Sequence, residues 1–364
     1  MPPSQNSKVK LDPSHLFDAL ILGAGPAGLS AALSLCRINR TAAVFSTPEF
    51  RNDSAHRAHT ILSRDHTPPA VIRQAGRDEI EAYGTTRFIE RAIQSATKSA
   101  ADNTFQVVDS EGETWRGRRL ILATGVRDLL RTSIPGYREC WGKDITQCLF
   151  CDGLERAHLP AGVLGLSGPM TLHGISMLFH MGCPQITIFA NGKLEVKDDA
   201  TRKALDIARA KGAVVDERRV ERFQHLPDGE GMEIHFINGK EPAHIGFLLD
   251  KPPTELNAAH IAKNLGLEIQ RDAAFGDEML RRDEPFGESN IKGVFVAGDA
   301  GTPFKQVTTA MFHGTMAGIG VNMQLIAEEQ EILAKEVDRD ANELNDKVIG
   351  VSRVREKDGG EWAH

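Results

Sequence analysis

Residues 17–28 read Phe-Asp-Ala-Leu-Ile-Leu-Gly-Ala-Gly-Pro-Ala-Gly, an apolar run that leads directly into a glycine-rich turn. The apolar run predicts a buried parallel strand, and the uncharged segment after the turn predicts a helix. In the spacing GxGxxG, Gly23 permits the tight turn, Gly25 lets the backbone approach a pyrophosphate, and Gly28 lets the helix pack against the strand. The stretch therefore predicts a dinucleotide-binding α/β unit with the diphosphate at the helix N-terminus.

The same region has no charged residue from Ala19 to Cys36, a length close to that of a transmembrane helix. Its glycines and Pro26 interrupt such a helix, and Asp18 stands where a signal peptide carries basic residues. A buried strand, turn and helix account for the run, so we expect no membrane association and a cytoplasmic location. Residues 1–16 are polar with three prolines and predict a flexible arm.

Composition narrows the class of protein further. The chain has 364 residues, enough for two or three domains, and 41% of them are hydrophobic, so it can bury real cores. The net charge of −7 argues against nucleic-acid binding, which favours a basic surplus. Five cysteines are too few for a secreted scaffold held together by disulfides.

The rest of the chain repeats the strand–turn–helix pattern. A second unit starts with a strand at 162–166, the composition changes after Lys251-Pro252-Pro253, and a last buried strand at 291–297 runs into Gly298-Asp299. Residues 68–100 are expected to be mostly helical. We predict an α/β fold of two Rossmann-like three-layer domains, the first discontinuous and interrupted by the second. The predicted segments are the arm 1–16, the first domain 17–130 and 252–326, the second domain 131–251, and a charged helix or tail 327–364.

Two cysteines lie three positions apart in Cys148-Leu149-Phe150-Cys151-Asp152. A dithiol at this spacing can close a small disulfide, and Asp152 could move a proton to or from a departing thiolate. A zinc pair completed by Cys140 or His158 and an inert or purely structural pair are the alternatives. A structural zinc site normally needs a second close pair, which the sequence lacks, so redox chemistry is favoured and no metal site is predicted.

The order of these motifs resembles the low-molecular-weight thioredoxin reductase family. Over roughly residues 17–326 the resemblance rests on the Gly23–Gly28 turn, Ala123-Thr124-Gly125, the Cys148–Asp152 motif, Gly298-Asp299 and Lys305-Gln306-Val307. It implies a homodimeric FAD enzyme with an NAD(P)-like second domain that carries the cysteines. The cofactor-binding residues that it implies are Gly23, Gly25, Pro26, Ala27, Gly28, Ser46, Arg51, Asn52, Thr124, Gly125, Gly298, Asp299, Lys305, Gln306 and Val307.

The second domain departs from the family members that use NADPH. Its glycine turn reads Gly165-Leu166-Ser167-Gly168-Pro169-Met170, and the stretch 189–192 has no arginine for a 2′-phosphate. With Phe50-Arg51-Asn52 and the region of His56 and His59, these departures resemble the dithiol oxidases of natural-product clusters that act on gliotoxin and holomycin.

That branch implies that Cys148 and Cys151 form an intramolecular disulfide in a small dithiol of the epidithiodiketopiperazine type, with O2 as the electron acceptor. Asp152 is the expected acid/base, and His56, His59 and His313 are weaker candidates. An NADPH-dependent thioredoxin reductase and a non-catalytic FAD protein remain as alternatives.

Overall fold

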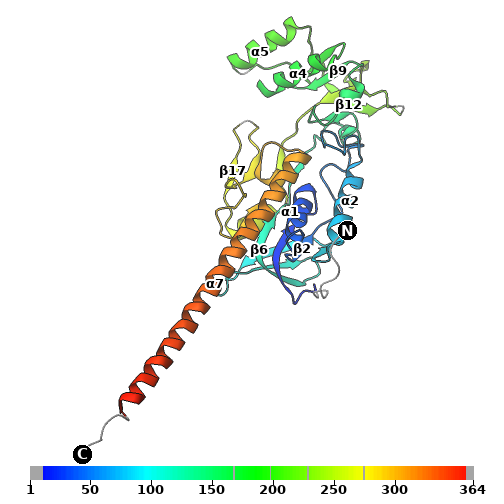
Figure 1. The fold of residues 1–364 in the computed structure, drawn as a ribbon. Helices are drawn as coiled ribbons and strands as arrows, with labels where there is room; N and C mark the ends of the chain where they lie inside the picture. The colour runs from blue at the N-terminus through cyan, green and yellow to red at the C-terminus, as the bar shows by residue number, and fades with distance from the viewer. Residues whose placement is uncertain (1–10, 167–168, 197, 228, 274, 358–364) are drawn as a thin grey trace, which may run out of the picture.

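The computed structural model describes residues 11–166, 169–196, 198–227, 229–273 and 275–357. A seven-stranded sheet forms the lower part of the molecule in Figure 1, in the order β3-β2-β1-β6-β5-β4, with β19 also paired to β6. Its strands are β1 (Leu16–Leu22), β2 (Ala42–Phe45), β3 (Thr86–Ile89), β4 (Ile93–Lys98), β5 (Phe105–Asp109), β6 (Thr114–Leu122) and β19 (Val294–Val296).

Strand β6 changes its neighbour along its length. Its first half pairs antiparallel with β5 and its second half pairs parallel with β19, while β1 lies along its other side. Because β1, β6 and β19 run parallel, the residues that follow them meet at one edge of the sheet. The Gly23 turn, Thr124 and Gly298, which are far apart in the sequence, come together in this way.

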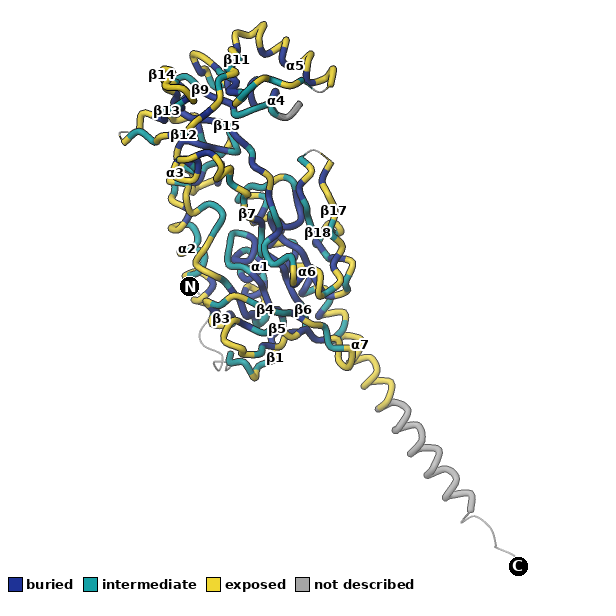
Figure 2. Tube along the Cα trace, turned by 180° about the vertical axis from the view of Figure 1, so that it is seen from behind, coloured by how far each residue is buried: buried dark blue, intermediate teal, exposed yellow. Residues whose placement is uncertain are grey.

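The helices that accompany this sheet include α1 (Pro26–Cys36), α2 (Pro69–Glu81) and the long α7 (Val307–Lys357). Helix α7 lies beside α1 and then projects away from the body of the molecule (Figures 1 and 2). Close contact with α1 depends on Gly314, because a Cβ there would lie 2.0 Å from the carbonyl oxygen of Ala27. The predicted division at 326/327 falls inside this one continuous helix.

A second sheet, of five parallel strands in the order β11-β10-β9-β15-β8, occupies the other end of the molecule (Figure 1). Its strands are β8 (Ile145–Thr146), β9 (Ala161–Leu164), β10 (Ile186–Phe189), β11 (Val214–Asp216) and β15 (Phe247–Leu249). The accompanying elements are α3 (Tyr137–Cys140), the 3-10 turn η1 (Leu154–Arg156), α4 (Pro169–Met181), α5 (Asp199–Ala210) and an antiparallel sheet of β12 (Val220–His225), β13 (Met232–Phe236) and β14 (Lys240–Ile245).

The chain passes between the two parts through an antiparallel pair of short strands, β7 (Val126–Asp128) and β16 (Thr254–Leu256). The remaining elements beside the first sheet are α6 (Ala259–Leu265), β17 (Ile269–Arg271), β18 (Glu278–Leu280) and η2 (Gly298–Gly301). The fully buried members of two hydrophobic clusters all belong to 17–126 and 256–325, and those of the other two all belong to 134–248.

Residues 68–100 are helical only in their first part, as α2. The expectation of mostly helix over 68–100 was wrong after Glu81, because Thr86–Ile89 pairs with β2 and Ile93–Lys98 pairs with β5. In both segments, pairing with an existing strand overrides the local helical appearance.

Ser167 and Gly168 of the second glycine turn lie outside the described residues. Within the described ranges, none of the helices combines the length and apolar content that crossing a membrane requires.

Candidate redox site

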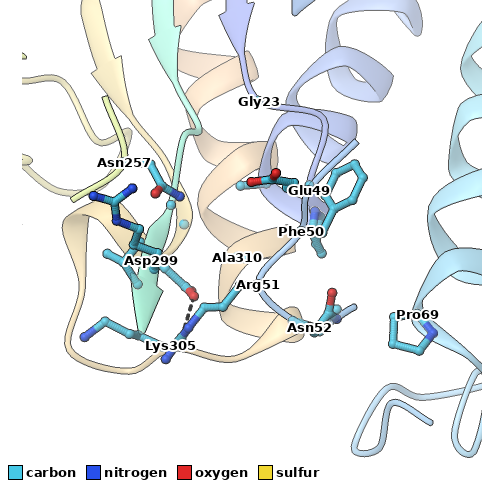
Figure 3. A pocket seen from close by; sticks show the side chains of 18 of the residues that line it. Gly23, Glu49, Phe50, Arg51, Asn52, Pro69, Asn257, Asp299, Lys305 and Ala310 are labelled. Carbon is cyan, nitrogen blue, oxygen red and sulfur yellow. Dashed lines mark hydrogen bonds and ion pairs between the residues drawn. The ribbon is translucent and has the colours of Figure 1, made fainter. Parts of the chain in front are cut away.

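A cavity of about 620 Å³ lies where the three parallel strands end, and it is large enough for a cofactor. Its walls come from both parts of the molecule. They are formed by the glycine turn, the segments after β2, β6 and β19, the start of α7, and residues 147–152, here called the cysteine loop. Figure 3 shows Gly23, Arg51, Asp299 and Lys305 around it. Cys148, Cys151, Asp152 and all the predicted cofactor-binding residues except Gly28 line this cavity.

The glycine turn has the space that a phosphate group needs. No atom lies within 4 Å of the Cβ position of Gly25, whereas a Cβ on Gly23 would lie 2.3 Å from the carbonyl oxygen of Ala123. Gly28 faces away from the cavity, and its Cβ position lies 1.8 Å from the carbonyl oxygen of Gly23. The three glycines therefore have the separate roles expected from the spacing, with Gly25 open toward the cavity. The turn fits the pyrophosphate of a dinucleotide.

Arg51 lines the cavity and forms hydrogen bonds with three segments of the chain. Its guanidinium donates to both carboxylate oxygens of Asp128, at 3.0 and 2.7 Å, and to Asp299 at 2.9 Å. It also donates to Oε1 of Gln147, the residue before Cys148, at 2.7 Å. Burial raises the pKa of Asp299, and the ion pair with Arg51 opposes that rise. Arg51 thus links the aspartate after β19 to the cysteine loop.

The start of α7 forms another wall. Lys305, Gln306 and Val307 line the cavity, and the Lys305 ammonium pairs with the buried carboxylate of Asp277 at 2.9 Å. Because an ammonium has three donors, this ion pair leaves Lys305 able to donate to a ligand as well.

Ser46 and Asn52 lie on the segment after β2. The hydroxyl of Ser46 donates to the carbonyl of Thr47, and Asn52 accepts a hydrogen bond from Arg73. Glu49 also lines the cavity, as Figure 3 shows, and places a carboxylate on the side of the glycine turn. A carboxylate near the end of the second strand is the usual partner of ribose hydroxyls.

Asn257 and His260 also line the cavity, although the sequence does not predict them there. Asn257 donates to the carbonyl of Thr124, and its own carbonyl accepts from the Thr124 hydroxyl. No motif marks Asn257 in the sequence. It reaches the site because β16 pairs with β7, which follows Gly125 directly.

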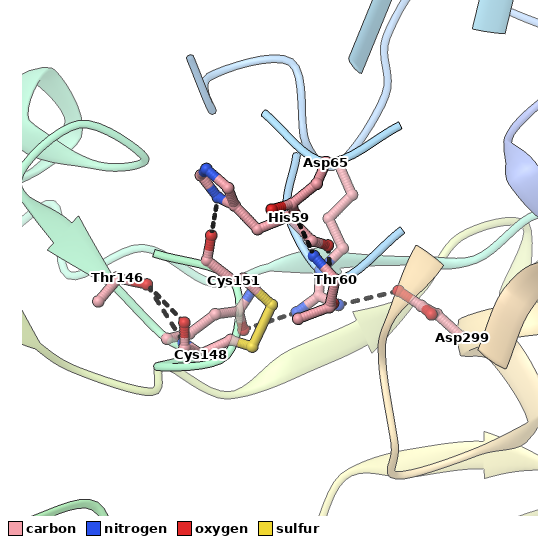
Figure 4. The surroundings of a disulfide bond; sticks show 9 residues. His59, Thr60, Asp65, Thr146, Cys148, Cys151 and Asp299 are labelled. Atoms are coloured by element: carbon pink, nitrogen blue, oxygen red, sulfur yellow. Dashed lines mark hydrogen bonds and ion pairs between the residues drawn. A yellow bond between two sulfur atoms is a disulfide. The ribbon is translucent and has the colours of Figure 1, made fainter. Parts of the chain in front are cut away.

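Cys148 and Cys151 form a disulfide with a Cα–Cα distance of 5.2 Å (Figure 4). Both cysteines and Asp152 line the cavity. Cys36, Cys140 and Cys183 are free and buried, and burial raises the pKa of Cys36 to about 11 and that of Cys140 to about 12. Burial also raises the pKa of Cys183, and a raised pKa makes a thiol a poorer nucleophile.

Asp152 is the titratable group with the clearest shift beside the disulfide. Burial raises its pKa to about 6, with His59 and Arg156 opposing and Glu155 reinforcing that effect. A carboxyl group with this pKa can exchange a proton near neutral pH. The site therefore places a carboxyl group with a raised pKa next to Cys151 in the chain.

The three histidine candidates lie in different places. His59 lines the cavity, and its Nδ1 lies 2.5 Å from the carbonyl oxygen of Cys151; Figure 4 shows its ring beside that carbonyl rather than the sulfurs. His56 is exposed and does not line the cavity. His313 is buried on α7 beside Arg282, 3.2 Å away, and burial lowers its pKa. Of the three, only His59 reaches the cysteine loop through a described contact.

The sequence profile of the pyridine nucleotide-disulphide oxidoreductase family matches residues 17–314. The chain belongs to this family. The thioredoxin reductase sirT of Leptosphaeria maculans is 38% identical over 331 residues, which cover 88% of this chain and 98% of that protein. The thioredoxin reductase tcpT of Claviceps purpurea is 35% identical over 322 residues, which cover 86% and 96%.

Solved structures show the same family fold. An oxidoreductase from Agrobacterium tumefaciens superposes with a TM-score of 0.76 at 28% identity, covering 86% of this chain and 99% of that one. The crystal structure of HlmI gives 0.79 at 28% identity, covering 89% and 97%. These matches confirm the predicted thioredoxin reductase-like fold of two Rossmann-type domains. The protein is an FAD-dependent oxidoreductase of this family.

In the second domain, the end of strand β10, where residues 189–192 contain no arginine, has different surroundings from the strand ends around the cavity. Asn191, after β10, accepts a hydrogen bond from the backbone amide of Val220. The Arg219 side chain lies near Gly192, 3.9 Å from its Cβ position. A guanidinium therefore does stand beside this turn, although it comes from the segment before β12 rather than from the strand end itself.

Proposed function

We propose that this protein is a dithiol oxidase that forms an intramolecular disulfide in a small molecule of the epidithiodiketopiperazine type, with O2 as the final electron acceptor. The observation that carries the proposal is the position of the Cys148–Cys151 disulfide. The disulfide lines the same cavity as the glycine turn and Asp299, so a substrate sulfur and FAD can both reach it from that cavity.

The proposed reaction uses the disulfide as the oxidant of the substrate. One substrate thiolate attacks Cys148, breaks the Cys148–Cys151 bond and leaves a thiolate on Cys151. The second substrate thiol attacks the substrate sulfur of this mixed disulfide, so that the product leaves as a cyclic disulfide and Cys148 departs as a thiolate. Asp152 accepts the proton of an incoming thiol. FAD bound in the cavity would supply the two-electron chemistry that reoxidises the cysteine pair at the expense of O2, with hydrogen peroxide as the product.

Oxygen consumption tests the proposal directly. We expect the purified yellow protein to consume O2 with small dithiols, to release peroxide, and to need no NADPH. Monothiols of similar size provide the control, because they lack the second sulfur that resolves the mixed disulfide. Absence of dithiol-dependent O2 uptake across a panel of such substrates would refute the proposal.

An NADPH-dependent thioredoxin reductase is the second candidate, favoured by the names of the relatives, which are thioredoxin reductases, and by Arg219 beside Gly192. Anaerobic mixing distinguishes the two functions. If the protein is an oxidase, a dithiol bleaches the flavin absorbance and NADPH does not. If it is a reductase, NADPH bleaches the flavin rapidly.

We also propose that the enzyme is a cytoplasmic homodimer that binds neither nucleic acid nor membranes. The experiments are the molar mass of the holoenzyme in solution and the localisation of the tagged full-length chain. A monomeric mass or a membrane-bound fraction would contradict these assignments.

A further inference from the structure

Three side chains with metal-binding atoms converge beside the disulfide. His59 Nε2 lies 3.1 Å from His66 Nδ1 and 3.2 Å from a carboxylate oxygen of Glu155. All three ligand atoms lie within 4.8 Å of one another. The sequence predicts no metal site, because Glu155 is far from His59 and His66 in the chain and the three residues share no metal-binding motif.

The other ring nitrogen of each histidine has its own acceptor. His59 Nδ1 faces the carbonyl oxygen of Cys151, which can only accept, so that nitrogen carries a proton. His66 Nε2 lies 3.3 Å from a carboxylate oxygen of Asp65 and carries a proton for the same reason. In the neutral rings, the two nitrogens that face each other at 3.1 Å are then both unprotonated.

Two lone pairs and a carboxylate at this distance repel one another unless a cation lies between them. Zn²⁺ is bound by histidine and carboxylate at about 2.0–2.2 Å, so neighbouring ligands in a tetrahedral site lie about 3.3 Å apart. The two separations from His59 Nε2, 3.1 Å to His66 Nδ1 and 3.2 Å to Glu155, are close to that value, and the third pair, His66 and Glu155, lies within 4.8 Å. A histidine ligand whose second nitrogen donates to a backbone carbonyl or a carboxylate is the usual arrangement around such metals.

Hydrogen bonds within the loop 58–67 hold two of the ligands in place. The amide of Ala58 donates to the carbonyl of Thr67 at 2.9 Å, Asp65 accepts from the amide of Thr60, and Arg57 donates to the carbonyl of His66. The third ligand, Glu155, belongs to η1 in the other part of the chain. The donor set therefore joins two segments that are distant in the sequence.

We propose that His59, His66 and Glu155 form a binding site for one divalent transition-metal ion of the zinc class, beside the redox disulfide. The two nitrogens and one oxygen suit Zn²⁺ or Co²⁺ better than Mg²⁺ or Ca²⁺, which favour oxygen ligands throughout. Three protein ligands leave a tetrahedral ion one position for water or another ligand.

The test uses the oxidised holoenzyme, freed of metal by chelation and titrated calorimetrically with Zn²⁺. The disulfide stays closed so that Cys148 and Cys151 cannot bind the metal. We expect about one Zn²⁺ per chain, confirmed by metal analysis after dialysis, and no displacement by excess Mg²⁺. His66→Asn and Glu155→Gln should each weaken binding at least about tenfold.

Both variants keep the local backbone. Asparagine tolerates the positive φ of 60° at His66, and glutamine keeps the size of Glu155. The matched control is His244→Ala, an exposed histidine elsewhere, which should bind Zn²⁺ as the parent does. Absence of stoichiometric binding, or equal binding by the parent and His66→Asn, would overturn the proposal and leave a shared proton as the cation. Because the measurement needs no turnover, its result is independent of the proposed oxidase activity.

Discussion

At the residue scale, Cys148 and Cys151 form a disulfide that lines the cavity, whereas the other three cysteines are free and buried. Cys148→Ser and Cys151→Ser should each abolish dithiol-dependent O2 uptake, because either change removes the bond that the substrate attacks. Both variants should still bind FAD, measured by the flavin absorbance after gel filtration. Cys183→Ala, which changes a buried free thiol, is the control and should retain turnover. Activity in either serine variant would contradict the mechanism.

Asp152 predicts a pH dependence. As a base it must be ionised, and burial raises its pKa to about 6, so the rate of dithiol oxidation should fall as the pH drops through that value. Asp152→Asn should lose this acidic limb and lower the rate by about 10²–10⁴-fold. The measurement is the initial rate from pH 5 to 8 in the presence of a chelator. An unchanged pH profile in Asp152→Asn would assign the proton transfer to another group.

At the residue scale, the sequence predicts best what depends on one short stretch. The roles of the three glycines at 23, 25 and 28 follow from their spacing, because each concerns local backbone space. Asn257 and Glu155 could not be identified in this way. Each meets its partners only through tertiary contacts, Asn257 at Thr124 and Glu155 at His59.

At the scale of elements, Arg51 joins β7, η2 and the segment before Cys148. Arg51→Met should destabilise the protein by about 3–5 kcal/mol, because it leaves the carboxylates of Asp128 and Asp299 without their cation. The measurement is urea unfolding at saturating FAD. Arg127→Met is the neighbouring control on β7: its ion pair with Glu255 is exposed, so it should cost no more than about 1 kcal/mol. Equal effects of the two substitutions would show that the buried network contributes little.

The contact between α1 and α7 predicts a second effect. Gly314→Ala places a methyl group 2.0 Å from the carbonyl oxygen of Ala27, so α7 must shift away from the glycine turn. We expect a loss of about 1–3 kcal/mol and weaker FAD binding, measured by unfolding and by fluorescence titration of the apoprotein. Gly76→Ala on α2 meets only a side-chain atom of Leu29 at 3.5 Å and should be neutral or stabilising by up to about 1 kcal/mol. Similar losses in both variants would mean that helix packing is not the cause.

For the whole molecule, the sequence predicted the two Rossmann-type sheets because each begins with a continuous apolar strand before a glycine turn. It missed the strand pair β7–β16, since each member has only three residues and no periodic pattern. It also divided one helix at 326/327, where the composition changes from apolar to charged. The helix continues there because Arg40, Arg118 and Arg119 pair with Glu328 and Glu329 and hold its next turn against the sheet.

The predicted domain boundaries can be tested through that same strand pair. Asp128 lies opposite Thr254, and the amide of Leu129 donates to the carbonyl of Pro253 at 2.8 Å, so the two strands are close enough for a short turn. The fully buried residues of the four hydrophobic clusters divide between the two parts without overlap. Replacing residues 131–251 by two glycines leaves a hairpin loop of ordinary length.

We therefore expect the chain with 131–251 replaced to fold and to bind FAD with a yellow colour, since the glycine turn, Asp299 and the start of α7 all remain. It should not oxidise dithiols, because it lacks the disulfide. Absorbance after gel filtration, thermal unfolding and O2 uptake measure these outcomes, with full-length Cys148→Ser as the FAD-binding control. A colourless or aggregated product beside a yellow control would show that the FAD-binding part depends on the second domain for its fold.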